Sequence, residues 1–195
     1  MSHTLILASQ SPRRKALLQQ LGYNFTCMPA DIDESVLAGE CPEPYVARLA
    51  LAKAQAVAKQ SPVNTVVLGS DTSVVFAEHI LGKPDSFVDC QRMLTMLSGN
   101  THQVITAIAA VKDQQSEVVL VKTAVDFKPL SEQEITRYWQ TGEPQDKAGA
   151  YGIQGIGGQF VTQIQGSYSA VVGLPLYETA RLLTAFGVTS SMTMD

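Results

Sequence analysis

The sequence predicts an α/β protein: a single elongated domain in which helices flank a central mixed β-sheet. In the first half of the chain, short apolar runs at 4–8 and 66–68 alternate with segments of helical spacing. Two longer runs at 101–111 and 117–127 follow, separated by a polar turn, and predict a hairpin. Helical crossovers favour parallel strand pairs and a hairpin gives an antiparallel pair, so the expected sheet is mixed.

Helix-start signals locate the helices. Ser11 precedes Pro12, which predicts an N-cap and a first helical residue, and Gly22 ends that helix. Ser131 and Glu134 form a capping-box pattern that opens a helix to about residue 140. The other predicted elements are a strand at 24–28, helices at 43–59, 85–97 and 175–186, and a turn at 69–72 between two apolar runs.

Composition excludes several classes of protein. The chain has 195 residues, 45% of them hydrophobic and 16% charged, which suits one globular domain and excludes a disordered chain or a coiled coil. The net charge is −4, from 14 basic and 18 acidic residues, which disfavours a nucleic-acid scaffold. We expect the domain to span 1–188 and the polar segment 189–195 to be a disordered tail.

The cysteines and the uncharged segments indicate a cytoplasmic protein. Cys27, Cys41 and Cys90 show no CxxC spacing, so we expect reduced thiols that serve in packing rather than a zinc site. The stretch 148–177 has no charged residue, but its many glycines and glutamines do not suit a membrane span. No motif typical of a P-loop, a hydrolase nucleophile elbow or a zinc protease occurs.

The first candidate site is Ser9-Gln10-Ser11-Pro12-Arg13-Arg14, between a predicted strand and a helix start. Free backbone N–H groups at a helix N-terminus attract anions, and guanidinium groups match phosphate oxygens. Two solvated arginines on a capped helix are the alternative. Basic residues in a first turn oppose the helix dipole unless an anion compensates, so the pattern favours a phosphate site.

Two acidic candidates are more ambiguous. Asp71 follows an apolar run, where open α/β sheets place ligand-binding groups, and its carboxylate could accept a proton from water. Locally, a turn aspartate that bonds its own backbone is slightly favoured. Glu34 lies in the acidic loop 31–34, which could bind Mg²⁺ but is more typical of a solvated loop.

Two lysines and a glycine-rich segment complete the candidates. Lys53 lies at helical spacing from the residues of an apolar face, where a lysine either extends its ammonium toward solvent or pairs with phosphate. The same two alternatives apply to Lys83, which lies in a Gly-Lys-Pro turn. In the segment 146–155, glycines allow a close ligand approach, and the amide of Gln154 suits the imide edge of uracil or thymine. A flexible glycine loop is the alternative.

Taken in order, these motifs resemble the Maf family of nucleotide pyrophosphatases over almost the whole chain, to about residue 187. Each motif is weak alone, and the ordered set is specific. The motif around Gln154 resembles the branch that hydrolyses dTTP and UTP. The matching residues are Ala8-Ser9-x-Ser11-Pro12-Arg13-Arg14, Glu34, Lys53-Ala54, Gly69-x-Asp71-Thr72, Lys83-Pro84, Leu97-Ser98-Gly99 and Asp146-Lys147-Ala148-Gly149-x-Tyr151-x-Ile153-Gln154-Gly155.

The resemblance implies a role for each matching residue. Asp71 would be the general base, and Glu34 would bind a divalent cation, Mg²⁺ or Mn²⁺, together with Asp71. The resemblance further implies that Ser9, Arg14, Lys53 and Lys83 hold the triphosphate, that Arg13, Thr72 and Gln154 set nucleotide choice, and that Asp146 and Lys147 complete the cleft.

The resemblance also implies a fold and partners. It implies two lobes around a cleft, in a fold related to the inosine triphosphate pyrophosphatases, and assembly as a homodimer. The expected reaction is hydrolysis of dTTP and UTP to the monophosphate and pyrophosphate, and the expected substrates extend to modified pyrimidine nucleotides. The alternative is a nucleotide-sensing regulator of cell division or septum formation without significant turnover.

Overall fold

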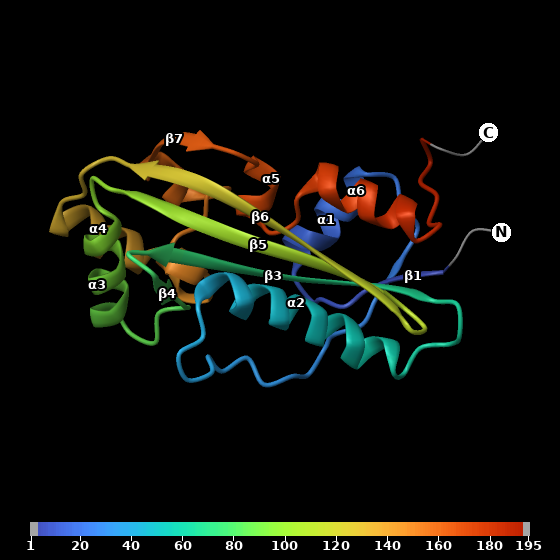
Figure 1. The fold of residues 1–195 in the computed structure, drawn as a ribbon. Helices are drawn as coiled ribbons and strands as arrows, with labels where there is room; N and C mark the ends of the chain where they lie inside the picture. The colour runs from blue at the N-terminus through green and yellow to red at the C-terminus, as the bar shows by residue number, and fades with distance from the viewer. Residues whose placement is uncertain (1–3, 193–195) are drawn as a thin grey trace. The chain divides into compact units, whose positions relative to one another are not determined.

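A computed structural model describes residues 4–192 and has a central mixed β-sheet with flanking helices, which confirms the predicted fold class (Figure 1). The strands are β1 (Leu5–Leu7), β2 (Thr26–Cys27), β3 (Val66–Phe76), β4 (His79–Leu81), β5 (Thr101–Lys112), β6 (Gln115–Phe127) and β7 (Val161–Gln165). The α-helices are α1 (Pro12–Gln20), α2 (Pro42–Ala58), α3 (Phe87–Leu97), α4 (Glu132–Gln140), α5 (Tyr168–Val172) and α6 (Leu176–Ala185). Short 3-10 helices cover Glu143–Asp146, Ala148–Ala150 and Ile156–Phe160.

The strands of the described residues lie in the order β2-β1-β3-β5-β6-β7, and β4 pairs with β3. β1 runs parallel to β2 and to β3, where Ile6 is opposite Thr26 and Val67 respectively. β4 runs antiparallel to β3, and β7 runs antiparallel to β6. The sheet therefore combines parallel and antiparallel pairs, as the sequence predicts, and β5 and β6 are neighbouring strands in it.

The chain divides into two compact units. Within the described residues, unit 1 comprises 4–71, 106–121 and 173–192. In unit 1, α2 covers one face of the sheet and α1 and α6 lie on the other (Figure 1). Ser11 caps α1 by accepting a hydrogen bond from the backbone N–H of Arg14, as its sequence predicts.

Unit 2 comprises Thr72–Ile105 and Lys122–Val172 and has its own apolar core. The aromatic rings of Phe127, Tyr138, Tyr151 and Phe160 pack within this core at tilted or edge-on angles. The predicted capping box of α4 is present, because Ser131 and Glu134 exchange both hydrogen bonds. The bends of the 146–160 segment are therefore built on a packed interior rather than on a loose loop.

The predicted turn at 69–72 is wrong, because these residues lie inside the continuous strand β3. Polar residues are tolerated in this buried strand because each has a partner. The hydroxyl of Ser70 donates to the carbonyl of Gly173 at 3.0 Å, and Asp71 accepts from Lys53 at 2.7 Å. Neither partner is visible from the local sequence pattern.

Other elements differ in detail. The predicted strand at 24–28 shortens to β2, and β4, β7, α5 and the 3-10 helices were not predicted. Cys90 is buried as expected, but Cys27 and Cys41 are exposed, so packing does not explain them. The expected disordered tail at 189–195 falls partly outside the described residues. Within them, Ser190 is buried and the Ser191 N–H donates to the carbonyl of Gly22 at 2.9 Å.

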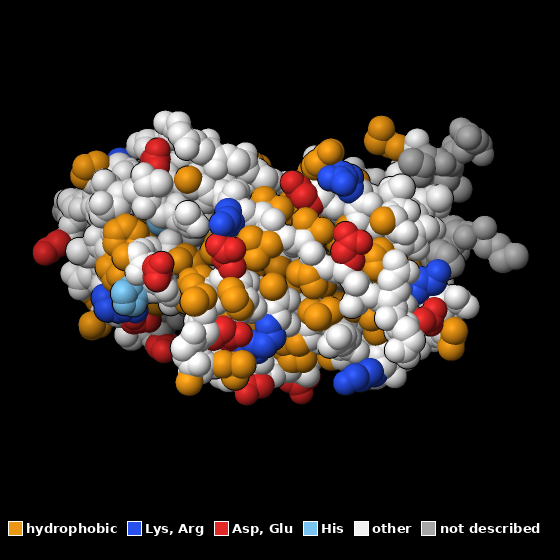
Figure 2. Space-filling model, viewed as in Figure 1, with side chains coloured by type: hydrophobic (Ala, Val, Ile, Leu, Met, Phe, Trp, Pro, Cys, Tyr) orange, Lys and Arg blue, Asp and Glu red, His pale blue; other side chains and the backbone are white. Residues whose placement is uncertain are grey.

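Charged side chains on the visible surface are mixed in sign. Figure 2 shows Lys and Arg scattered among Asp and Glu over the coloured residues, without a continuous basic stripe on that face. This distribution agrees with the small net negative charge. No helix within residues 4–192 combines the length and the apolar character needed to cross a bilayer.

Candidate active site

Asp71 lies in the middle of buried strand β3 and forms an ion pair with a lysine of α2. The ammonium of Lys53 is 2.7 Å from Oδ1 of Asp71, and the two side chains are only 11% and 9% exposed. The two elements approach closely because Gly69 has no side chain and faces the backbone of Ala50 and Ala54 in α2. A buried carboxylate requires such a partner, because an isolated charge is costly in a dry interior.

The same lysine reaches a second carboxylate. Nζ of Lys53 is 2.8 Å from Oε1 of Glu34, whose side chain is 55% exposed. One ammonium therefore bridges a carboxylate of β3 and a carboxylate of the acidic loop. Three residues that the sequence presents as separate candidates converge here. Lys53 is buried and does not extend into solvent, and its pairing with phosphate stays a prediction.

The loop that carries Glu34 is fastened to α2 by residues that sequence reasoning missed. The hydroxyl of Tyr45 donates to the backbone carbonyl of Glu34 at 2.9 Å. Arg48 donates to both carboxylate oxygens of Glu40 at 2.6 Å and to the carbonyl of Ser35 at 3.0 Å. Burial raises the pKa of Tyr45, and the negative charges of Asp71 and Glu34 raise it further. Loop partners at irregular spacing give no periodic signal that would identify these residues.

Arg14, at the start of α1, is within electrostatic range of both carboxylates. Burial lowers the pKa of Arg14, and the positive charge of Arg13 lowers it further. The negative charges of Asp71 and Glu34 act in the opposite direction and raise it. Nε of Arg14 donates to the carbonyl of Gly173 at 3.0 Å. The hydroxyl of Ser9 accepts the N–H of Ser11 at 3.1 Å, which shapes the turn into α1. Two of the predicted cationic residues of unit 1, Lys53 and Arg14, thus interact with the same two acidic groups.

The other predicted site residues belong to unit 2. Thr72 follows Asp71 in β3 and is half-buried, whereas Lys83 and Gln154 are exposed. Asp146 and Lys147 form an ion pair. The N–H of Gly149 donates to the carbonyl of Gly82 at 3.0 Å, which joins the turn of Lys83 to the glycine-rich segment.

The acidic pair has donor chemistry that suits a divalent cation. Within residues 4–192, no three side chains of His, Cys, Asp or Glu converge as a complete ligand set. Glu34 and Asp71 do share one cation, the ammonium of Lys53. Mg²⁺ is commonly held by one or two carboxylates, with waters and substrate phosphates completing the shell. Two carboxylate ligands therefore fit such an ion in the presence of a phosphate substrate.

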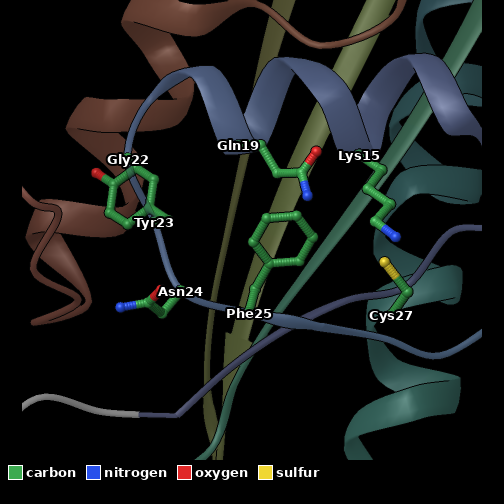
Figure 3. A pocket seen from close by; sticks show the side chains of 7 residues that line it. All are labelled: Lys15, Gln19, Gly22, Tyr23, Asn24, Phe25 and Cys27. Carbon is green, nitrogen blue, oxygen red and sulfur yellow. The ribbon is translucent and has the colours of Figure 1, made fainter.

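Unit 1 also has a surface pocket (Figure 3). None of the predicted site residues lines this pocket. The side chain of Gln19 lies over the ring of Phe25, and the ammonium of Lys15 points toward the sulfur of Cys27. The pocket is lined by Lys15, Gln19, Gly22, Tyr23, Asn24, Phe25 and Cys27.

Comparison with known proteins identifies the family. A model of Maf-like proteins matches residues 4–186, and the chain therefore belongs to this family. A relative from Pseudoalteromonas atlantica is 60% identical over 92% of this chain and 95% of its own length, and is named dTTP/UTP pyrophosphatase. A relative of the same name from Vibrio parahaemolyticus is 57% identical over 95% of this chain and 98% of its own length.

A solved structure shares the fold. The chain is similar to a HAM1 protein from Coxiella burnetii with a TM-score of 0.53, over 95% of this chain and 100% of that chain. Sequence identity between the two is 18%, so this likeness concerns the fold alone.

Proposed function

We propose that this protein is a nucleoside triphosphate pyrophosphatase that hydrolyses dTTP and UTP to the monophosphate and pyrophosphate. The observation that carries the proposal is the bridge from Lys53 to both Asp71 and Glu34, within electrostatic range of Arg14. Acidic groups that activate water and cationic groups that hold phosphate thus occur together. The names of the relatives, 52–60% identical, supply the substrate class.

The reaction needs a base and a held phosphate chain. Water attacks the α-phosphorus, the bond from that phosphorus to the oxygen that bridges to the β-phosphate breaks, and pyrophosphate leaves. The carboxylate of Asp71 accepts the proton of the attacking water. Asp71 is buried within β3 and paired with Lys53, so the base is held in place before substrate binds.

The basic residues neutralise charge on the substrate. Ser9, Arg14, Lys53 and Lys83 hold the triphosphate, and Asp146 and Lys147 complete the binding region. Lys53 can exchange its carboxylate partners for phosphate oxygens, because all of these are anionic acceptors. Glu34 and Asp71 would hold Mg²⁺ or Mn²⁺, which supplies charge neutralisation at the phosphates when bound.

Nucleotide choice involves a further set of residues. The amide of Gln154 offers a donor and an acceptor to the imide edge of uracil or thymine. Arg13 and Thr72 contribute to the same choice. Assembly as a homodimer, which the family resemblance implies, is also part of this proposal.

The proposal is tested by pyrophosphate release across a panel of nucleoside triphosphates, with Mg²⁺ or Mn²⁺, together with calorimetric titration of dTTP. We expect release from dTTP and UTP to exceed release from dCTP, dATP and dGTP by at least about tenfold, the discrimination that paired hydrogen bonds provide. Tight binding of dTTP without release of pyrophosphate would instead indicate a nucleotide-sensing regulator and would overturn the proposal.

A further inference from the structure

The glycine-rich segment that carries Gln154 is wrapped around a carboxylate. Oε2 of Glu143 accepts the N–H of Ile156 at 2.7 Å, and Oε1 accepts the N–H of Gly157 at 2.9 Å. Glu143 is the first residue of a 3-10 helix that follows α4 and is half-buried. The backbone after Gln154 is therefore fixed by a side chain that lies 13 and 14 residues away in sequence.

The backbone before Gln154 is fixed by the same network. The hydroxyl of Tyr138 donates to Oε1 of Glu143 at 2.7 Å and accepts the N–H of Gly152 at 3.1 Å. The ring of Tyr138 is anchored in the core of unit 2, at 4.9 Å from the ring of Phe160. The backbone before Gln154 is thus bonded directly to Tyr138, and the backbone after it is connected to Tyr138 through the carboxylate of Glu143.

The glycines of this segment are required by the closeness of the approach. A Cβ at Gly155 would collide with the carboxylate of Glu143. A Cβ at Gly157 would lie 2.5 Å from the hydroxyl of Tyr138, and one at Gly158 would lie 2.6 Å from the carbonyl of Ile153. Gly155 and Gly157 therefore leave room for the carboxylate and for its Tyr138 partner, and without these contacts the glycines would leave the segment highly flexible.

The hydrogen bonds keep the carboxylate charged. Burial raises the pKa of Glu143, but hydrogen bonds from Gly157, Tyr138 and Ile156 lower it to a net value below that of an ordinary glutamate. Burial and the bond to Glu143 raise the pKa of Tyr138, so its hydroxyl remains the donor. Backbone N–H groups arranged around an anion form a stable nest.

We propose that Glu143 is a positioning residue for nucleotide choice, which holds the segment 152–157 and thereby the Gln154 amide in one conformation. This inference rests on the proposed function. A preformed amide loses little conformational entropy when a base binds, whereas a mobile amide can adapt to other bases. Glu143 therefore affects selectivity through Gln154 without contact with the substrate.

The test is the ratio of kcat/KM for dTTP to that for dCTP in Glu143→Gln. The amide of the variant has one acceptor oxygen, so at least one of the three donors loses its acceptor while the volume is unchanged. We expect the ratio to fall about tenfold, and faster amide exchange over 152–158. Gln154→Ala should lower the ratio at least as far, and the double variant should match Gln154→Ala alone, because both changes act on one group.

Glu132→Gln is the matched control, because Glu132 is an exposed residue in the first turn of α4 and carries the same charge. Tyr138→Phe, which removes only the hydroxyl, provides a second variant if Glu143→Gln does not fold, and should lower the ratio in the same direction. An unchanged ratio, or equal losses for dTTP and dCTP, would overturn the positioning role. A wild-type protein that releases no pyrophosphate from any nucleotide would instead refute the proposed function.

Discussion

Lys53 connects the acidic residues of the candidate site, and its role could be inferred only in part from the sequence. Its helical spacing placed it on the apolar face of α2, which the structure confirms, since Lys53 is buried between Ala50 and Val57 along that helix. Its partners could not be predicted, because Glu34 and Asp71 lie 19 and 18 residues away in a loop and a strand. Side-chain pairs of this kind depend on tertiary packing rather than on local pattern.

Replacing Lys53 should destabilise the fold as well as abolish turnover. Lys53→Met leaves Asp71 as a buried carboxylate without its ammonium partner, which typically costs about 3–5 kcal/mol. The measurement is the free energy of unfolding in urea at pH 7. Lys59→Met, at the exposed C-cap of the same helix, should change it by less than about 0.5 kcal/mol. Equal stability of the two variants would contradict the buried ion pair.

His102 should make stability depend on acid. Its ring is buried, Nε2 lies 2.8 Å from the hydroxyl of Tyr151, and Nδ1 has no hydrogen-bond partner among the described residues. Burial lowers its pKa from 6.5 to about 4, against the opposing charge of Asp126. Below pH 6.5 the unfolded chain therefore binds a proton that the folded chain excludes until pH about 4.

The free energy of unfolding should consequently fall as pH decreases from 6.5 to 4, with a contribution from His102 of up to about 1.4 kcal/mol per pH unit. His102→Gln should remove this contribution to the slope, whereas His79→Gln, at an exposed position, should leave it unchanged. Urea unfolding at several pH values measures both slopes. A slope that is the same in His102→Gln and in the wild type would refute the assignment.

At the level of elements, the contact of α2 with β3 sets the geometry of the site. Gly69 lies two residues before Asp71, and its missing side chain lets α2 approach the strand. In a strand, residues two positions apart point to the same face, so Gly69 and Asp71 both face α2. Because Gly69 and Asp71 lie on the same face of β3, α2 can approach the strand at Gly69 while its Lys53 reaches the carboxylate of Asp71.

Gly69→Ala should displace the helix. The added Cβ would lie 2.8 Å from the backbone nitrogen of Ala54 and would also meet the carbonyl of Ala50, both of which belong to backbone that cannot rotate away. Overpacking of this kind costs about 1–3 kcal/mol. Gly82→Ala is the control, because a Cβ there meets nothing within 4 Å. Thermal unfolding compares them, and a Gly69→Ala melting temperature equal to that of Gly82→Ala would contradict the close approach.

The elements also show where sequence patterns are informative. Capping signals at Ser11 and Ser131 predicted helix starts correctly, because capping is a local interaction. The polar run Gly69-Ser70-Asp71-Thr72 misled, because turn composition and a buried strand with long-range partners look alike in sequence. The network of Glu143 was missed for a related reason. Its carboxylate oxygens accept hydrogen bonds from backbone N–H groups, and every residue other than proline has such a group, so the sequence gives no signal for this contact.

At the scale of the whole molecule, fold class and family were predictable and the detailed packing was not. The alternation of strands and helices, followed by a hairpin, predicted the mixed sheet, and the ordered motifs predicted the family that the comparisons show. β3, β5 and β6 each contribute residues to both compact units. The division of the chain at Asp71 and Thr72 could not be predicted, because it depends on long-range contacts.

The central claim is that this protein hydrolyses nucleoside triphosphates with Asp71 as the base. The most direct test is steady-state release of pyrophosphate from dTTP by the wild type, Asp71→Asn and Asp113→Asn. Asp113 lies in the exposed turn between β5 and β6, where its φ of 52° also suits asparagine, so it is a matched control. We predict that Asp71→Asn lowers kcat by about 10²–10⁴-fold and that Asp113→Asn retains wild-type turnover. Wild-type turnover in a folded Asp71→Asn protein would contradict the account.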